Sequence, residues 1–167
     1  MDLKLRTLPA ASIDAALSLA KHYRDLNQAD EAESICRDIL AVSPTQPEAL
    51  RLLGLALTDQ FPDAWDARMD EALASFARLE SDYDRTYYTG IAWERCGKAQ
   101  LAHKQSRNAL HSLEHALNYF DDACDIARAD APEAILRWNR CVRLLTTHPD
   151  ILKARATDPA HAGHFGD

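Results

Sequence analysis

The feature of this chain that most limits its possible folds is a helical pattern that returns after about 34 residues. A small residue, followed three positions later by a large apolar one, recurs in register at Ala20 and Tyr23, Gly54 and Leu57, and Gly90 and Trp93. A period of this length is typical of stacked helical hairpins, in which small side chains let neighbouring helices approach closely. Because the chain also has only five glycines and few β-branched runs, the sequence predicts an all-α fold.

Turn-forming residues divide the chain into about seven predicted helices. A lead-in of residues 1–11 precedes a helical domain of residues 12–149, and residues 150–167 form a tail expected to hold at most one weak turn. The predicted helices cover about 12–26, 30–42, 47–59, 64–82, 84–97 or somewhat beyond, a long segment of roughly 20 to 25 residues ending near Arg128, and 132–147. They are expected to pair as antiparallel hairpins and to stack as an α-solenoid.

Composition narrows the classes of function. The chain has 167 residues and a formal net charge of −7, which disfavours non-specific binding to nucleic acid or anionic lipid. No apolar run approaches the roughly 20 residues that cross a bilayer, and the start is too polar for a signal peptide. The four cysteines are widely spaced, as expected for reduced thiols. These features predict a cytoplasmic protein without a membrane partner.

The recurring residues resemble the tetratricopeptide repeat (TPR) family. The resemblance covers about residues 13–104 well and 116–147 loosely. Ala20, Tyr23, Ala32 and Pro44 match the family's small, aromatic, alanine and proline places. The proline is missing after the second and third repeats, and an insertion of about 14 residues lengthens the third. The resemblance implies three to four repeats and a concave groove lined by the first helix of each hairpin.

The same resemblance implies a set of groove residues and a function. Proteins of this family bind peptides or partner proteins in the concavity, so we expect a non-enzymatic binding module without a cofactor, whose partner is a protein or peptide and possibly acidic. The family's inner-face places fall on Leu17, Lys21, Arg24, Arg51, Leu55, Tyr87, Ile91, Arg95, Arg140 and Arg143. Only Lys21 fits the carboxylate clamp by which one subfamily holds a chaperone tail. The alternative is a solvated helix face, balanced by Asp25, Glu48 and Glu94.

Two strings suggest chemistry instead. His111, Glu114 and His115 match the H-x-x-E-H pattern of inverted zinc peptidases, in which two histidines one turn apart hold zinc and the glutamate activates water. A small zinc metallohydrolase is therefore one alternative function, although Glu133 is the only later glutamate able to complete the site. A second string, Asp121, Asp122 and Asp125, matches the D-D-x-x-D pattern of isoprenoid synthases and would suit a magnesium ion.

A third hypothesis is structural. Repeat proteins need polar outer faces at the ends of their stack to stay apart. The sequence shows no obvious polar capping helix at its C-terminus. Self-association through the hydrophobic end of the stack would make the chain a homo-oligomeric scaffold.

Overall fold

The computed structural model describes residues 3–127 and 131–159. Within these ranges every regular element is helical, so the prediction of an all-α fold is confirmed. In this part of the chain, eight α-helices follow a short 3-10 turn, η1 (Ala10–Ser12), one more than expected: α1 (Ile13–Asp25), α2 (Ala29–Val42), α3 (Pro47–Asp59), α4 (Phe61–Ala77), α5 (Asp82–Ala102), α6 (Ser106–Ile126), α7 (Glu133–Thr147) and α8 (Pro149–Thr157). None of them is long and apolar enough to cross a membrane.

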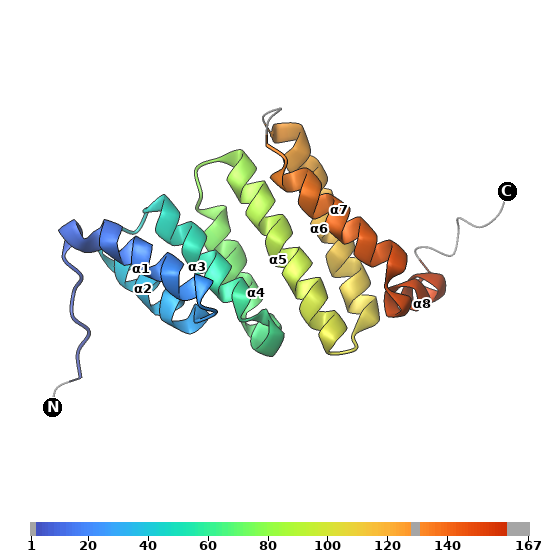
Figure 1. Ribbon diagram of the computed structural model, residues 1–167, viewed down its shortest axis with the longest axis horizontal. Coiled ribbons are helices and arrows are strands. Elements are labelled where there is room, and N and C mark those ends of the chain that lie inside the picture. Colours follow the sequence, from blue (N-terminus) through green and yellow to red (C-terminus); the bar gives the residue numbers. More distant parts are fainter. Residues whose placement is uncertain (1–2, 128–130, 160–167) are drawn as a thin grey trace.

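The helices stand side by side in chain order, with α1 and α8 at opposite ends of the row (Figure 1). Each helix packs against the next, and α1 also contacts α3, α3 contacts α5, and α5 contacts α7. Among α2, α4 and α6 no comparable contact occurs over the residues described. We therefore call the side formed by α1, α3, α5 and α7 the odd-helix face. In Figure 1, α1 lies in front of α2 and α7 in front of α6.

The helix ends follow local signals in the sequence. Gln46 caps α3 by accepting hydrogen bonds from the backbone N–H groups of Glu48 and Ala49, and Pro47 occupies the first turn, where no N–H is needed. The Ser81 hydroxyl accepts from the N–H of Asp84 at the start of α5. These capping residues fix where α3 and α5 begin, and both helices contribute to the odd-helix face.

Two hydrophobic cores hold the row together. The first lies among α1 to α5 and the second among α5 to α8, and Leu55, Tyr88 and Trp93 pack against both. Within each core a glycine of one helix receives a phenylalanine of the next. A Cβ at Gly54 would lie 2.3 Å from Phe76, and one at Gly90 would lie 2.7 Å from Phe120. The close approach that the small residues predicted therefore occurs at both glycines.

Several helix boundaries differ from the prediction. Helix α4 begins at Phe61 and not near Ala64, with Pro62 in its first turn and non-helical backbone at Ala64. The expected insertion appears as the length of α5 and α6, each of 21 residues. The predicted end of the long helix near Arg128 lies outside the described residues. The described part of the tail forms most of the nine-residue helix α8, in which Ile151 is buried against the second core.

Candidate binding site on the odd-helix face

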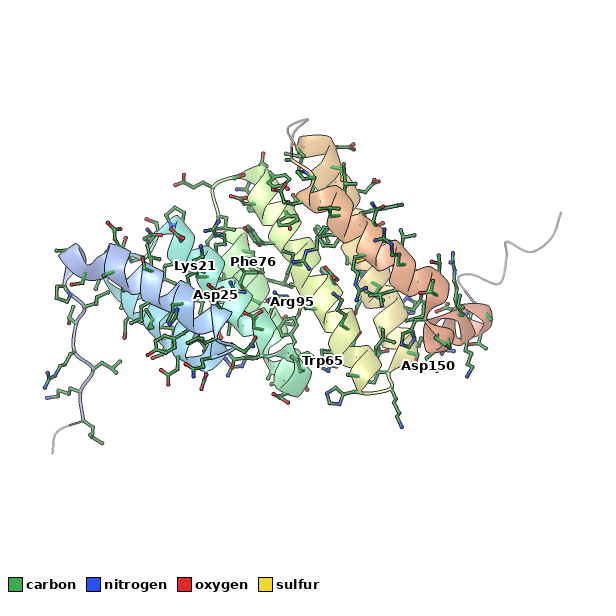
Figure 2. The ribbon with its side chains drawn as sticks, in the orientation of Figure 1. Lys21, Asp25, Trp65, Phe76, Arg95 and Asp150 are labelled. Carbon is green, nitrogen blue, oxygen red and sulfur yellow. The ribbon has the colours of Figure 1, made fainter. Side chains whose placement is uncertain are left out.

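A carboxylate shared by two arginines joins three helices of the odd-helix face. Asp59, at the end of α3, accepts from Arg24 Nε of α1 at 2.7 Å and is ion-paired through its other oxygen with Arg95 of α5. Arg95 also donates to the Thr58 hydroxyl and to the carbonyl oxygen of Leu55, the latter at 3.2 Å. We call Arg24, Asp59 and Arg95 the Asp59 cluster. Figure 2 shows Arg95, which reaches from α5 towards α3.

Burial and charge act in opposite directions on Arg95. Burial lowers the pKa of its guanidinium, and the nearby Asp59 carboxylate partly offsets this by favouring the charged form. The positive charges of Arg24 and Arg137 lower the pKa of Arg95 further. Arg95 is therefore paired with a carboxylate, Asp59, that also pairs with Arg24.

A second carboxylate, Glu94, is also shared by two cations. Glu94 is 0% exposed, and it pairs with Lys98 one turn later on α5 and with Arg137 Nη1 of α7 at 3.1 Å. We call these three residues the Glu94 cluster. Burial alone would lower the pKa of Arg137, but the Glu94 carboxylate and a hydrogen bond with Tyr87 raise it. The Glu94 cluster therefore ties α7 to α5.

Two hollows open beside these clusters. One, of about 270 Å³, combines cationic side chains with an apolar wall and is lined by Thr58, Asp59, Phe61, Pro62, Arg95, Lys98, Ala99 and Ala102. The other, of about 380 Å³, is more polar and is lined by Arg24, Asp25, Asn27, Ala29 and Asp59. The first hollow brings together Arg95 and Lys98, one cation from each cluster.

The structure brings together only part of the predicted groove. Arg24 and Arg95 share Asp59, whereas Leu17 and Ile91 are only 7% and 3% exposed and belong to the hydrophobic cores. At these two helix positions the side chains face neighbouring helices. Leu55 is half-buried and packs against both cores.

The remaining predicted groove residues keep polar or exposed positions. Lys21 is exposed on α1, one turn before Asp25 (Figure 2). Arg51 pairs with Glu48 at 3.2 Å, and Tyr87 is half-buried beside Arg137. Arg140 and Arg143 are exposed on α7, but no described hydrogen bond or ion pair joins them to either cluster.

The site also contains residues that the sequence did not predict there. Asp59, Lys98 and Arg137 complete the two clusters, and the Thr58 hydroxyl accepts a hydrogen bond from Arg95. Glu94, expected as a solvated balancing charge, is fully buried. A helix pattern shows which residues share a face, but it does not show which side chains meet across α1, α3, α5 and α7. Only the four-residue spacing of Glu94 and Lys98, which favours an ion pair on one helix, was visible in the sequence.

The two motifs that suggested metal chemistry are not assembled into metal sites. His111 Nε2 lies 3.2 Å from Asp158 after α8, and the His115 ring packs on Trp93 with centroids 4.7 Å apart. Asp121, Asp122 and Asp125 are exposed or nearly so along the end of α6, and nowhere in residues 3–127 and 131–159 do three His, Cys, Asp or Glu side chains come together to hold a metal ion.

The cysteines are free thiols, and three of them are buried. Burial raises the pKa of Cys36 and of Cys141 to about 12, so both thiols stay protonated near neutral pH. Burial also raises the pKa of Cys96. These three thiols therefore pack as core residues.

Comparison with known proteins adds no assignment to this geometry. No known protein family matches the sequence, and no curated protein was found to be similar to it. The TPR assignment therefore stays a prediction that depends on the recurring residues and the helix contacts.

Proposed function

We propose that the chain is a non-enzymatic, TPR-like helical-repeat module that binds a peptide or a partner protein across the odd-helix face. The observation that carries this proposal is the arrangement of polar side chains on α1, α3, α5 and α7, which meet across helix boundaries in the Asp59 and Glu94 clusters. Surfaces built from several stacked helices are suited to extended partners, because each helix supplies one or two contacts.

Two features support a repeat architecture. Gly54 of α3 receives Phe76 of α4, and Gly90 of α5 receives Phe120 of α6, so the same contact recurs one hairpin later. Among the described residues, contacts also run between helices that are close in the row and not between its two ends. A single hairpin cannot bury both of its faces, so each hairpin in such a stack is covered by the next one along the row.

The composition of the face favours recognition of a polar partner. Lys98 and Arg137 are partly exposed while their charges are held in place by the buried Glu94. Tyr87 is half-buried, stacks on Tyr83 with centroids 5.6 Å apart, and also contacts Phe120. Aromatic and arginine side chains that are fixed before binding are typical anchors of protein interfaces.

Site-specific photo-cross-linking in cells of the source organism tests this proposal. A photoreactive amino acid would replace Lys21 or Arg51 on the odd-helix face and, as matched controls, the exposed Asp38 of α2 or Asp70 of α4. We expect the same partner protein to be linked from Lys21 and Arg51 and from neither control. Equal linking from all four positions, or from the controls alone, would contradict binding on this face.

Self-association is a second candidate function. Leu19 and Leu26 are 46% and 52% exposed on α1, at one end of the row, and Ile135 and Leu136 of α7 are also exposed. Uncovered apolar side chains near the ends of a stack favour contacts between copies. Light scattering distinguishes the two candidates, because a scaffold gives a mass above 18.7 kDa that falls in the Leu19→Lys/Leu26→Lys variant.

A further inference from the structure

The charges within the two clusters do not balance. Each cluster holds one carboxylate between two cationic side chains, so each carries an excess of one positive charge. The whole chain has a formal net charge of −7, so the excess charge of each cluster is opposite in sign to the net charge of the protein. Partly desolvated cations without a full counter-charge favour a carboxylate, because charge-assisted hydrogen bonds are stronger than neutral ones.

Neighbouring charges on the face do not remove this excess. Arg51 is paired with Glu48, so that pair is neutral. On α1, Asp25 lines the polar hollow beside Arg24 and Asp59, and Lys21, one turn earlier, carries the opposite charge, so the two together add no net charge. The two positive charges thus remain in the Asp59 and Glu94 clusters.

Both clusters can be reached from outside. The Lys98 and Arg137 side chains are 38% and 36% exposed, although the carboxylate between them is buried. Arg95 and Lys98 both line the 270 Å³ hollow, whose wall contains Phe61 and Pro62. A carboxylate at either cluster would therefore lie next to an apolar recess.

We propose that the odd-helix face binds an internal acidic segment of a partner protein that places one carboxylate side chain at the Asp59 cluster, a second at the Glu94 cluster, and an apolar side chain in the hollow between them. This inference rests on the proposed function and names the chemistry of the partner. Two carboxylates are required because each cluster lacks one negative charge.

Fluorescence anisotropy with short labelled peptides tests the inference. The probes are capped at both ends and contain two glutamates separated by one to four residues, one of them leucine; the comparison peptides carry glutamine in place of one or both glutamates. We expect the best peptide with two glutamates to bind at least about tenfold more tightly than its single-glutamate forms. Its affinity should fall as salt concentration rises.

Two charge-neutral variants locate the contacts. Lys98→Gln leaves Glu94 paired with Arg137, and Arg24→Gln leaves Asp59 paired with Arg95, so each variant removes only the excess charge of one cluster. The control Arg107→Gln makes the same change in net charge at an exposed residue of α6. We expect about tenfold weaker peptide binding in each cluster variant and unchanged binding in the control, with all three variants keeping the wild-type melting temperature within a few degrees.

Several results would overturn the inference. One is that no two-glutamate peptide binds at concentrations up to about 1 mM. Another is that Arg107→Gln and Lys98→Gln weaken binding equally. A third is that binding appears only when the peptide C-terminus is free. Tighter binding of a single-stranded oligonucleotide of equal charge would also overturn it. If cross-linking from Lys21 and Arg51 succeeds while these peptides fail, the acidic partner is wrong and the binding module stands. If cross-linking fails as well, both proposals fall.

Discussion

Gly54 has no room for a side chain, so its replacement tests the close contact between α3 and α4. A Cβ there would lie 2.3 Å from Cε1 of Phe76, a fully buried ring that stacks on Tyr88. Alanine is favoured over glycine within helices by about 1 kcal/mol, but an overlap of this depth costs about 1–3 kcal/mol more than a fitted contact. We expect Gly54→Ala to lower the free energy of unfolding, as measured by urea denaturation.

The double variant Gly54→Ala/Phe76→Leu separates the steric contact from other effects of the alanine. Because the shorter leucine leaves space where the Phe76 ring stood, the double variant should lose less stability than the sum of the two single variants. Additive losses, or a Gly54→Ala protein as stable as the wild type, would show that the two helices do not approach closely at this position.

For individual residues of the site, the sequence predicted which helix carries them but not which side chains they contact. The repeat placed Lys21, Arg51 and Arg95 on the helices that form the face, and all three lie there. The sequence did not predict that Asp59 and Glu94 would each hold two cations, because three of the four pairs join different helices and residues more than 30 positions apart. Only Glu94 and Lys98 lie on the same helix. Burial of Glu94 depends on the position of α7, which no local pattern in α5 specifies.

At the scale of elements, Glu33 connects α2, α3 and α4. Its carboxylate accepts from Gln60 Nε2 at 2.7 Å and pairs with Arg37 at 2.7 Å and with Arg68 at 2.6 Å. Burial alone would raise the pKa of Glu33, but the hydrogen bonds from Gln60 and Arg37 and the charges of Arg68 and Arg37 lower it below its ordinary value of 4.5. The ionised form is therefore bound more favourably in the folded state.

This depressed pKa gives a definite pH dependence. The contribution of Glu33 to stability is fully present above its unfolded pKa and is lost as the pH falls through its lower, folded pKa. Between about pH 5 and pH 3 the wild type should therefore lose more stability than Glu33→Gln, whose amide does not titrate. The control Glu31→Gln, at an exposed residue of α2, should follow the wild type. Melting temperatures measured across this window would contradict the assignment if Glu33→Gln and the wild type changed in parallel.

Helix α8 depends on packing that its own sequence barely shows. Ile151 is fully buried against the second core, whereas Leu152, the next residue, is 44% exposed. We expect Ile151→Ala to lower the free energy of unfolding by about 2–5 kcal/mol, and Leu152→Ala to change it by less than about 0.5 kcal/mol. Similar losses in the two variants, measured by urea denaturation, would show that α8 is not docked through Ile151.

The same helix explains why some elements could be predicted and others could not. Pro47 sets the start of α3, Pro132 precedes the start of α7, and Pro149 follows its end. Each of these prolines acts locally, so these boundaries could be predicted. By contrast, α8 has nine residues and buries only Ile151 and Ala154, too few for a periodic pattern. Its stability comes from contact with α6 and α7. Tertiary contacts of this kind cannot be predicted from the sequence of a short segment alone.

At the scale of the whole molecule, two cores joined at α3 and α5 determine how the protein should unfold. Over the residues described, helices α1 and α2 have no substantial contact with α6, α7 or α8, and only Leu55, Tyr88 and Trp93 pack against both cores. In stacked repeats the stability is close to a sum of local and nearest-neighbour terms, so a loss at one end is felt mainly there. The row of helices should therefore open from its ends and not as one unit.

Hydrogen exchange measured by mass spectrometry tests this expectation with two core variants. Ile151→Ala, in the second core, should speed exchange in α7, α8 and part of α6 and leave α1 and α2 close to wild type, because opening free energies differ between regions. Ile39→Ala, at a fully buried residue of the first core, should do the reverse. A uniform increase along the chain in both variants would mean that the two cores unfold together and would count against a stack of nearest-neighbour repeats. Opposite, end-specific patterns would follow directly from a row in which each helix is held by its neighbours.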